Sequence, residues 1–151
     1  MKLDVAVTHG QLCVFAPALD HPYNDWSEAH VGQGFSWRPG SVSFAVGDGA
    51  ASVVVEVSHV STPPDVAASA SAIRVPFQVP ASNQVEIGSV MSGAEVSVGA
   101  GSYALFYLAP QSSSQPFRLL FMAAAAVEPA VLKESAQAKM QAAYLMKATP
   151  A

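Results

Sequence analysis

The chain has 151 residues, of which 51% are hydrophobic and 12% are charged, and its formal net charge is -4. This length fits one domain with a buried core, and this composition excludes a disordered chain. From Leu3 to Val127 there are nine acidic and three basic residues, so the body of the molecule disfavours direct binding to nucleic acid.

Apolar residues that alternate with polar or small ones predict eight or nine short strands. In chain order these stretches are 3–7, 11–15, 42–46, 53–57, 73–79, 85–87, 96–98, 103–107 and 117–121. Turn sequences separate them, and Gly47-Asp48-Gly49 is predicted to form a hairpin loop. Because Pro76 cannot donate to a sheet ladder, its strand is expected at an edge or at a bulge. Together these features predict a mainly β protein, an antiparallel, jelly-roll-like β-sandwich.

Two segments depart from the strand pattern. The sequence Asp25-Trp26-Ser27-Glu28 matches a capping box and predicts one short helix after the first strands, with Asp25 as the cap and Glu28 reaching back. This helix is expected to run to about Val31 and to end at Gly32 or Gly34.

The second segment is residues 128–147, where Ala, Leu, Lys, Gln and Met favour a C-terminal helix with an imperfect apolar stripe. We therefore expect residues 1–126 to form the sandwich domain. Residues 127–151 are expected to form a helical tail that packs on this domain or on a partner chain, where it offers a possible homodimer contact.

The chemistry-bearing residues predict neither an enzyme nor a metal centre. The four histidines lack the i, i+4 spacing of a helical zinc site, and no Cys/His cluster accompanies them. No nucleophile elbow of the G-x-S-x-G type occurs, and helix capping already explains Asp25 and Glu28, the nearest pair of carboxylates. The one cysteine, Cys13, lies in an apolar run and is predicted to be a small buried hydrophobic residue. We expect no catalytic residue and no cofactor.

The N-terminal sequence MKLDVAVTHG lacks the long apolar core of a secretory signal, and nowhere do eighteen apolar residues follow one another. We therefore expect a cytoplasmic protein without a membrane span.

Residues 24–44 concentrate two Trp, two Phe and an Arg-Pro-Gly turn, whereas most of the chain is rich in Val, Ala and Ser. Trp and Arg are frequent anchors of protein interfaces. Two alternatives remain open at this point. Trp26 and Trp37 could plug one end of the sandwich while Arg38 pairs with a local carboxylate. The two Trp could instead form a stacking platform in a small-molecule or carbohydrate-binding module.

Several blocks of sequence, in the same order, resemble the competence protein J family, the inhibitors of the bacterial DNA-entry nuclease. They are N-D-W-S-E (24–28), G-F-S-W-R-P-G-S-V-S-F (34–44), I-R-V-P-F-Q-V (73–79), V-E-I-G-S-V-M-S (85–92) and G-x-Y-x-L-x-Y (101–107). The resemblance covers about Val5 to Met122. No family counterpart is recognised for the Ala-rich tail after Ala123.

The resemblance implies a non-enzymatic inhibitor or immunity-type protein that binds a bacterial DNase and blocks it. A nuclease presents a basic groove to DNA, and an acidic surface with aromatic anchors suits such a groove. The residues that we expect at this partner-binding surface are Asp20, Tyr23, Asp25, Trp26, Glu28, Trp37, Arg38 and Asp48. The acids among them would supply charge, and Tyr23, Trp26 and Trp37 would be the anchors.

Overall fold

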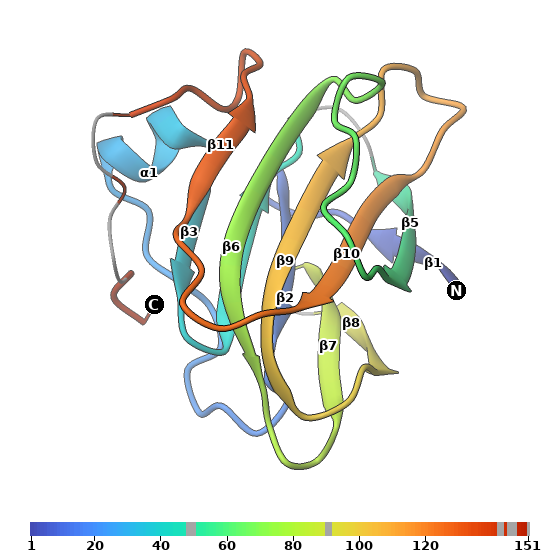
Figure 1. The fold of residues 1–151 in the computed structure, drawn as a ribbon. Helices are drawn as coiled ribbons and strands as arrows, with labels where there is room; N and C mark the ends of the chain where they lie inside the picture. Colours follow the sequence, from blue (N-terminus) through green and yellow to red (C-terminus); the bar gives the residue numbers. More distant parts are fainter. Residues whose placement is uncertain (48–50, 90–91, 142–143, 145–147, 151) are drawn as a thin grey trace.

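The alternating apolar residues form the inward faces of two sheets that pack against each other, as Figure 1 shows. The structure is a computed structural model that describes residues 1–47, 51–89, 92–141, 144 and 148–150. One sheet has six strands in the order β1 (Lys2–Ala6), β5 (Ser52–His59), β10 (Phe117–Ala123), β9 (Gly101–Ala109), β6 (Ser71–Val79) and β11 (Ala130–Lys133). The other has five, in the order β3 (Phe35–Arg38), β4 (Ser41–Ala45), β2 (Gln11–Phe15), β7 (Gln84–Ser89) and β8 (Ser92–Ser97). The predicted mainly β fold is confirmed.

The prediction of a wholly antiparallel sandwich was wrong for one pair of strands. β10 runs parallel to β5, with Leu119 opposite Val57, while it is antiparallel to its other neighbour, β9. β9 and β10 form a hairpin around residues 110–116, so the direction of β10 is already fixed when it meets β5. The position of Pro76 agrees with its prediction. The pairing of β11 with β6 ends at Arg74, so among the described residues β6 has no strand partner at Pro76 on the side away from β9.

Aromatic side chains join the two sheets across the core. The ring of Phe44 from β4 stacks on that of Tyr107 from β9, with centroids 4.5 Å apart and planes within 7°. Burial raises the pKa of Tyr107 well above its ordinary value, so its hydroxyl stays neutral and reaches the carbonyl oxygen of Ala45 at 3.4 Å. The inward faces of the two sheets therefore meet in one core, and a second, smaller apolar cluster on β6, β9 and β10 contains Phe106, Leu108 and Leu120.

The predicted short helix is present as α1 (Glu28–Gln33), but Ser27, not Asp25, is its N-cap. The backbone N–H of Ser27 donates to Nδ1 of His30 at 2.9 Å, and the N–H of His30 donates to Oγ of Ser27 at 3.4 Å. A histidine ring thus takes the place that Glu or Gln has in an ordinary capping box. Gly34 ends the helix, as expected, with φ +85°.

The prediction of a C-terminal helix over residues 127–151 was wrong for the described part of this segment. Residues 130–133 instead extend the six-stranded sheet as β11, and Val131 is buried in the core. The ring of Tyr144 packs on Phe35 with centroids 5.7 Å apart, and its hydroxyl accepts the N–H of Val131 at 3.0 Å. The open edge of β6 offers backbone partners that override the local helix preference. The possible homodimer contact through this tail stays a prediction.

The end of the tail lies along β3, the edge of the five-stranded sheet. The N–H of Ala148 donates to the carbonyl oxygen of Trp37 at 2.7 Å, and the N–H of Asp25 donates to the carbonyl oxygen of Thr149 at 2.8 Å. In Figure 1 the described part of the tail that follows β11 runs beside α1, and the last described residues lie near β3. No helix of the described residues is long and apolar enough to cross a membrane.

The buried state predicted for Cys13 is confirmed, since its side chain is 1% exposed. Burial raises the pKa of the Cys13 thiol to about 11, partly offset by the hydroxyl of Ser43 at 3.5 Å. A raised thiol pKa means that the thiolate is scarce at pH 8. We expect the native protein to leave a chromogenic disulfide reagent unreacted at pH 8, and one equivalent to react after unfolding in urea. Full reaction of the native protein within minutes would contradict the buried position.

Candidate partner-binding surface

The connection between β2 and α1 lies on the outer face of the five-stranded sheet. The alternation of β3 points Phe35 and Trp37 into the core and Ser36 and Arg38 outward. Oγ of Ser36 donates to the carbonyl oxygen of Asp25 at 2.8 Å. The sheet therefore holds the backbone of the segment that carries most of the predicted site residues.

Asn24 is the centre of this attachment and is 5% exposed. Its Nδ2 donates to the carbonyl oxygens of Ser36, at 3.0 Å, and of Ser41, at 3.4 Å, while its Oδ1 accepts Nε of Arg38 at 2.8 Å. Arg38 also donates to the carbonyl oxygen of His21. Partial burial lowers the pKa of Arg38. The alternative in which Arg38 pairs with a local carboxylate is wrong, because its partners are an amide and a backbone carbonyl.

The two Trp have different environments. Trp37 is 6% exposed and belongs to the core, so it forms no stacking platform with Trp26, and this removes the basis for the carbohydrate-binding alternative. Trp26 is half-buried and its ring meets His30 edge-on, with centroids 6.5 Å apart. Burial lowers the pKa of His30, which favours the neutral ring at pH 7.

Trp26 also lines a pocket of about 440 Å³ between α1, the start of β2 and the tail. The other lining residues are His9, Gly10, Gln11, Val31, Ala45, Gly47, Ala136 and Gln137. The sequence did not indicate this pocket, because the residues of α1 and those of the tail that line it are more than 100 positions apart in the chain. They come together only when the tail packs beside α1.

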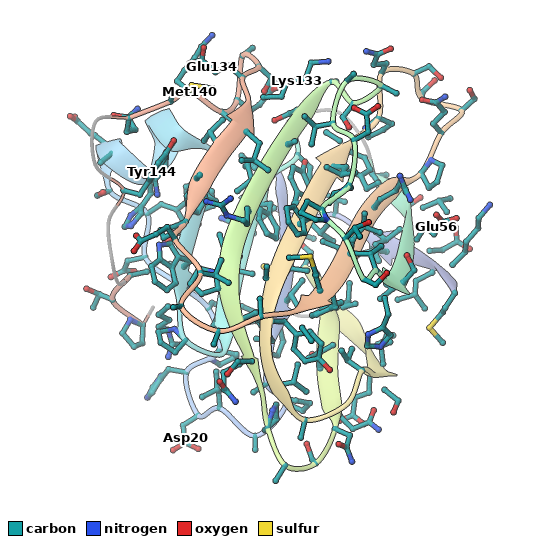
Figure 2. The ribbon with its side chains drawn as sticks, in the orientation of Figure 1. Asp20, Glu56, Lys133, Glu134, Met140 and Tyr144 are labelled. Atoms are coloured by element: carbon teal, nitrogen blue, oxygen red, sulfur yellow. The ribbon has the colours of Figure 1, made fainter. Side chains whose placement is uncertain are left out.

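The predicted acids are exposed but do not gather at one end of the sandwich. Asp25 and Glu28 flank the start of α1, whereas Figure 2 shows Asp20 at the opposite end of the molecule from Met140 of the tail. Within the described residues, none of these three carboxylates takes part in an ion pair. Asp48 lies outside the described residues. The three described acids among the predicted site residues are therefore exposed at separate places on the molecule.

Two further acids lie on the outer face of the five-stranded sheet and are not among the predicted site residues. Glu86 of β7 and Glu95 of β8 are directly opposite each other, and Glu86 is also opposite Phe15 of β2. Phe15 in turn meets the ring of Tyr23 edge-on, with centroids 5.6 Å apart. Like charges in opposed positions destabilise a sheet. The alternation of 85–87 places Glu86 on the polar face of its strand, whereas Glu95 lies outside the predicted stretch 96–98 and belongs to β8 in the structure.

The described residues include no group of three or more His, Cys, Asp or Glu side chains that could hold a metal ion. His59, the last residue of β5, is exposed and touches the rings of Tyr103 and Phe121. It is a histidine at the margin of the core.

The fold and this surface define a class of protein: a two-sheet β-sandwich whose outer face carries an acidic loop and a short helix. The sequence matches the family described as Competence protein J (ComJ) over residues 4–124, and the chain belongs to this family. A search of curated proteins by sequence found no match.

A similar solved structure is the crystal structure of ComJ from Bacillus subtilis, described as the inhibitor of the DNA-degrading activity of NucA. The TM-score is 0.67 at 18% sequence identity, and the alignment covers 82% of this chain and 96% of that one. This likeness confirms the fold. The tail after residue 124 lies outside the family match.

Proposed function

We propose that this protein is a non-enzymatic inhibitor that binds a DNA-degrading nuclease and blocks it. The observation that carries the proposal is membership of the competence protein J family over residues 4–124, together with the fold of an inhibitor of a DNA-degrading enzyme. The proposal includes a cytoplasmic location, since an inhibitor that protects the DNA of its own cell has to act where that DNA is.

The acidic outer face supports this proposal physically. Between Leu3 and Trp37 the chain has no Lys or Arg, so the loop and helix carry acidic charge, which Arg38 of β3 offsets only in part where it binds the loop at Asn24 and His21. A groove that binds DNA phosphates is basic, and an acidic protein surface is attracted to it and excludes DNA from it. A specific interface of standard size buries about 800 Å² on each partner.

The loop that presents these acids is already ordered in the free protein. Asn24, Arg38 and Ser36 hold its backbone to the sheet through the hydrogen bonds described above. A surface that is fixed before binding loses less conformational entropy in the complex. The structural role that we assign to Arg38 and Trp37 is therefore to position the loop and the helix, while Asp20, Tyr23, Asp25, Trp26 and Glu28 remain the proposed contacts.

The direct test is a titration of a DNA-degrading nuclease of the kind that ComJ inhibits with the purified protein, using cleavage of a fluorogenic DNA as the readout. We expect inhibition that saturates at a fixed molar ratio and a complex that elutes as one peak in size-exclusion chromatography. Undiminished cleavage at micromolar protein, with no complex, would refute the proposal.

Neutralising the exposed acids should slow the association of the complex. For the triple variant Asp20→Asn, Asp25→Asn and Glu28→Gln we expect an association rate about tenfold lower at low salt, because surface charges act mainly through steering. The difference should shrink at 0.5 M salt, where the Debye length is short. Stopped-flow fluorescence measures both rates.

The matched control carries the same change of net charge elsewhere. Asp4, Asp65 and Glu128 are also exposed, but they belong to β1 and to the connections of the six-stranded sheet. The variant Asp4→Asn, Asp65→Asn and Glu128→Gln should associate at nearly the wild-type rate. Equal slowing by both triples would mean that net charge, and not this face, steers the encounter.

A further inference from the structure

The helix α1 and the tail together form a corner of the molecule that we call the α1–tail corner, made of residues 26–33 and 134–141. The N–H of Lys139 donates to the carbonyl oxygen of Gly32 at 2.9 Å. Oε2 of Glu134 accepts the N–H of Met140 at 2.8 Å and so closes the tail segment into a loop. Figure 2 shows Glu134, Met140 and Tyr144 on this side of the molecule, beside α1.

Unpartnered buried polar atoms concentrate in and next to this corner. Among the described residues, the buried side-chain nitrogen and oxygen atoms without a hydrogen-bond partner are Nε1 of Trp26, Nε2 of His30, Oε1 of Gln33 and Nε1 of Trp37. The first three belong to residues 26–33 of the corner, whereas Trp37 of β3 lies in the core. Such atoms are rare in folded proteins because each one destabilises the native state. The corner is therefore the part of the described structure whose polar groups are least satisfied in the free protein.

The same corner exposes apolar side chains. The large hydrophobic residues exposed among the described residues are Met1, Val31, Val54 and Met140. Val31 is 62% exposed on α1, and Met140 is 55% exposed between Lys139 and Gln141, which both contact Gly32. The pocket of about 440 Å³ opens next to Val31 and is walled by Trp26 and Gln137. An apolar rim around a pocket with an aromatic wall is typical of the centre of a protein interface.

The charges around the corner indicate the chemistry of the occupant. Asp25 and Glu28 are exposed at the start of α1, and this part of the chain carries no Lys or Arg. The tail adds Glu134 and one described cation, Lys139. The pocket has apolar walls from Trp26, Val31 and Ala136 and polar ones from Gln11 and Gln137, and Asp25 and Glu28 are close to Trp26 in the chain. Such a pocket suits the side chain of a lysine or arginine, whose methylene stem packs on the apolar walls while its charge stays in polar surroundings.

We propose that the α1–tail corner is the central contact with the nuclease, and that its pocket receives a lysine or arginine side chain of that enzyme. This inference rests on the proposed function and locates the binding site for the nuclease at the α1–tail corner. The tail lies outside the family match at residues 4–124, so one of the two segments that form the corner is not part of the matched family sequence. The corner therefore sets which nuclease this protein recognises, whereas the acidic face steers the encounter.

Two substitutions test the corner. In the variants Val31→Ser and Met140→Ser the folded structure loses little, because both side chains are exposed. We expect each variant to bind the nuclease at least about tenfold more weakly by titration calorimetry, as for a central interface residue. The control is Val54→Ser, the same change at another exposed valine, on β5, and its affinity should stay within twofold of the wild type.

Hydrogen exchange on the unmodified protein gives an independent readout. On addition of the nuclease, the amides of 28–33 and 137–141 should gain protection, and those of 52–58 should not. If the wild type binds but the two variants keep its affinity, or if the protection appears only near Asp20, the inference is wrong and the proposed function stands. If the wild type binds no nuclease at all, the proposed function fails and the inference falls with it.

Discussion

Replacing Gly34 with alanine is expected to detach the tail from α1 and to lower the free energy of unfolding by about 3 kcal/mol. Gly34 has φ +85°, a conformation that disfavours any residue with a Cβ. A Cβ at this position would also lie 2.5 Å from the carbonyl oxygen of Gln137 and 2.6 Å from Cβ of Ala138. Because these are tail atoms, the least costly response is for residues 137–141 to move away from the helix.

A control glycine separates these two effects. Gly40 has nearly the same φ, +82°, but a Cβ there would meet nothing closer than Cδ1 of Leu19 at 3.9 Å. Gly40→Ala should therefore show only the backbone strain, about 1–2 kcal/mol. Urea unfolding measures both variants, and limited proteolysis should cut the tail faster in Gly34→Ala alone. Equal destabilisation, with an equally protected tail, would show that the contact between tail and helix contributes nothing.

Replacing Asn24 with alanine is the second substitution with a large expected effect. The variant loses the hydrogen bonds to Ser36 and Ser41 and leaves Nε of Arg38, a partly buried cation, without its amide partner. Together these losses should lower the free energy of unfolding by about 3 kcal/mol, measured by urea unfolding. Because Asn24 holds the loop of Asp20 to Asp25 on the sheet, nuclease inhibition should also weaken, even where the protein remains folded.

Asn83 provides the comparison for Asn24→Ala. It lies in the turn between β6 and β7, is exposed, and its side-chain oxygen accepts the backbone N–H of Ala100 at 2.8 Å. Asn83→Ala should destabilise the fold by about 2 kcal/mol, because it loses this hydrogen bond and places an alanine at φ +66°, and it should leave inhibition unchanged. Loss of inhibition in Asn83→Ala at a temperature where it is folded would mean that general destabilisation, and not loosening of the loop, weakens binding.

Most strands could be predicted because their side chains alternate, and two strands were missed for different physical reasons. In β3 the sequence Phe35-Ser36-Trp37-Arg38 does alternate, but Trp37 and Arg38 were assigned to an exposed binding surface, so the strand was not recognised. β11 reads Ala-Val-Leu-Lys, which favours a helix in isolation. It is a strand because β6 offers an open edge, which is a property of the assembled sheet and not of the local sequence.

The candidate site was predictable in residue type but not in the way its residues act. The acids of the segment from Asp20 to Glu28 are exposed, as expected for a charged surface. Trp37 and Arg38 were expected at the surface, yet one fills the core and the other binds the loop. Burial depends on which face of a strand a residue occupies, and this could not be assigned before β3 was recognised. The tail residues of the corner were beyond prediction, because their position follows from contacts with Gly32 and Gly34.

The place of β10 in the six-stranded sheet has a consequence for how the protein is made. β10 lies between β5 and β9, so the ribbon of β1 and β5 has no second neighbour until residue 123 has left the ribosome. Until then the apolar sides of Val53, Val55 and Val57 have only a partial cover. The sheet therefore closes late in synthesis, and until then these valine side chains are open to non-native contacts.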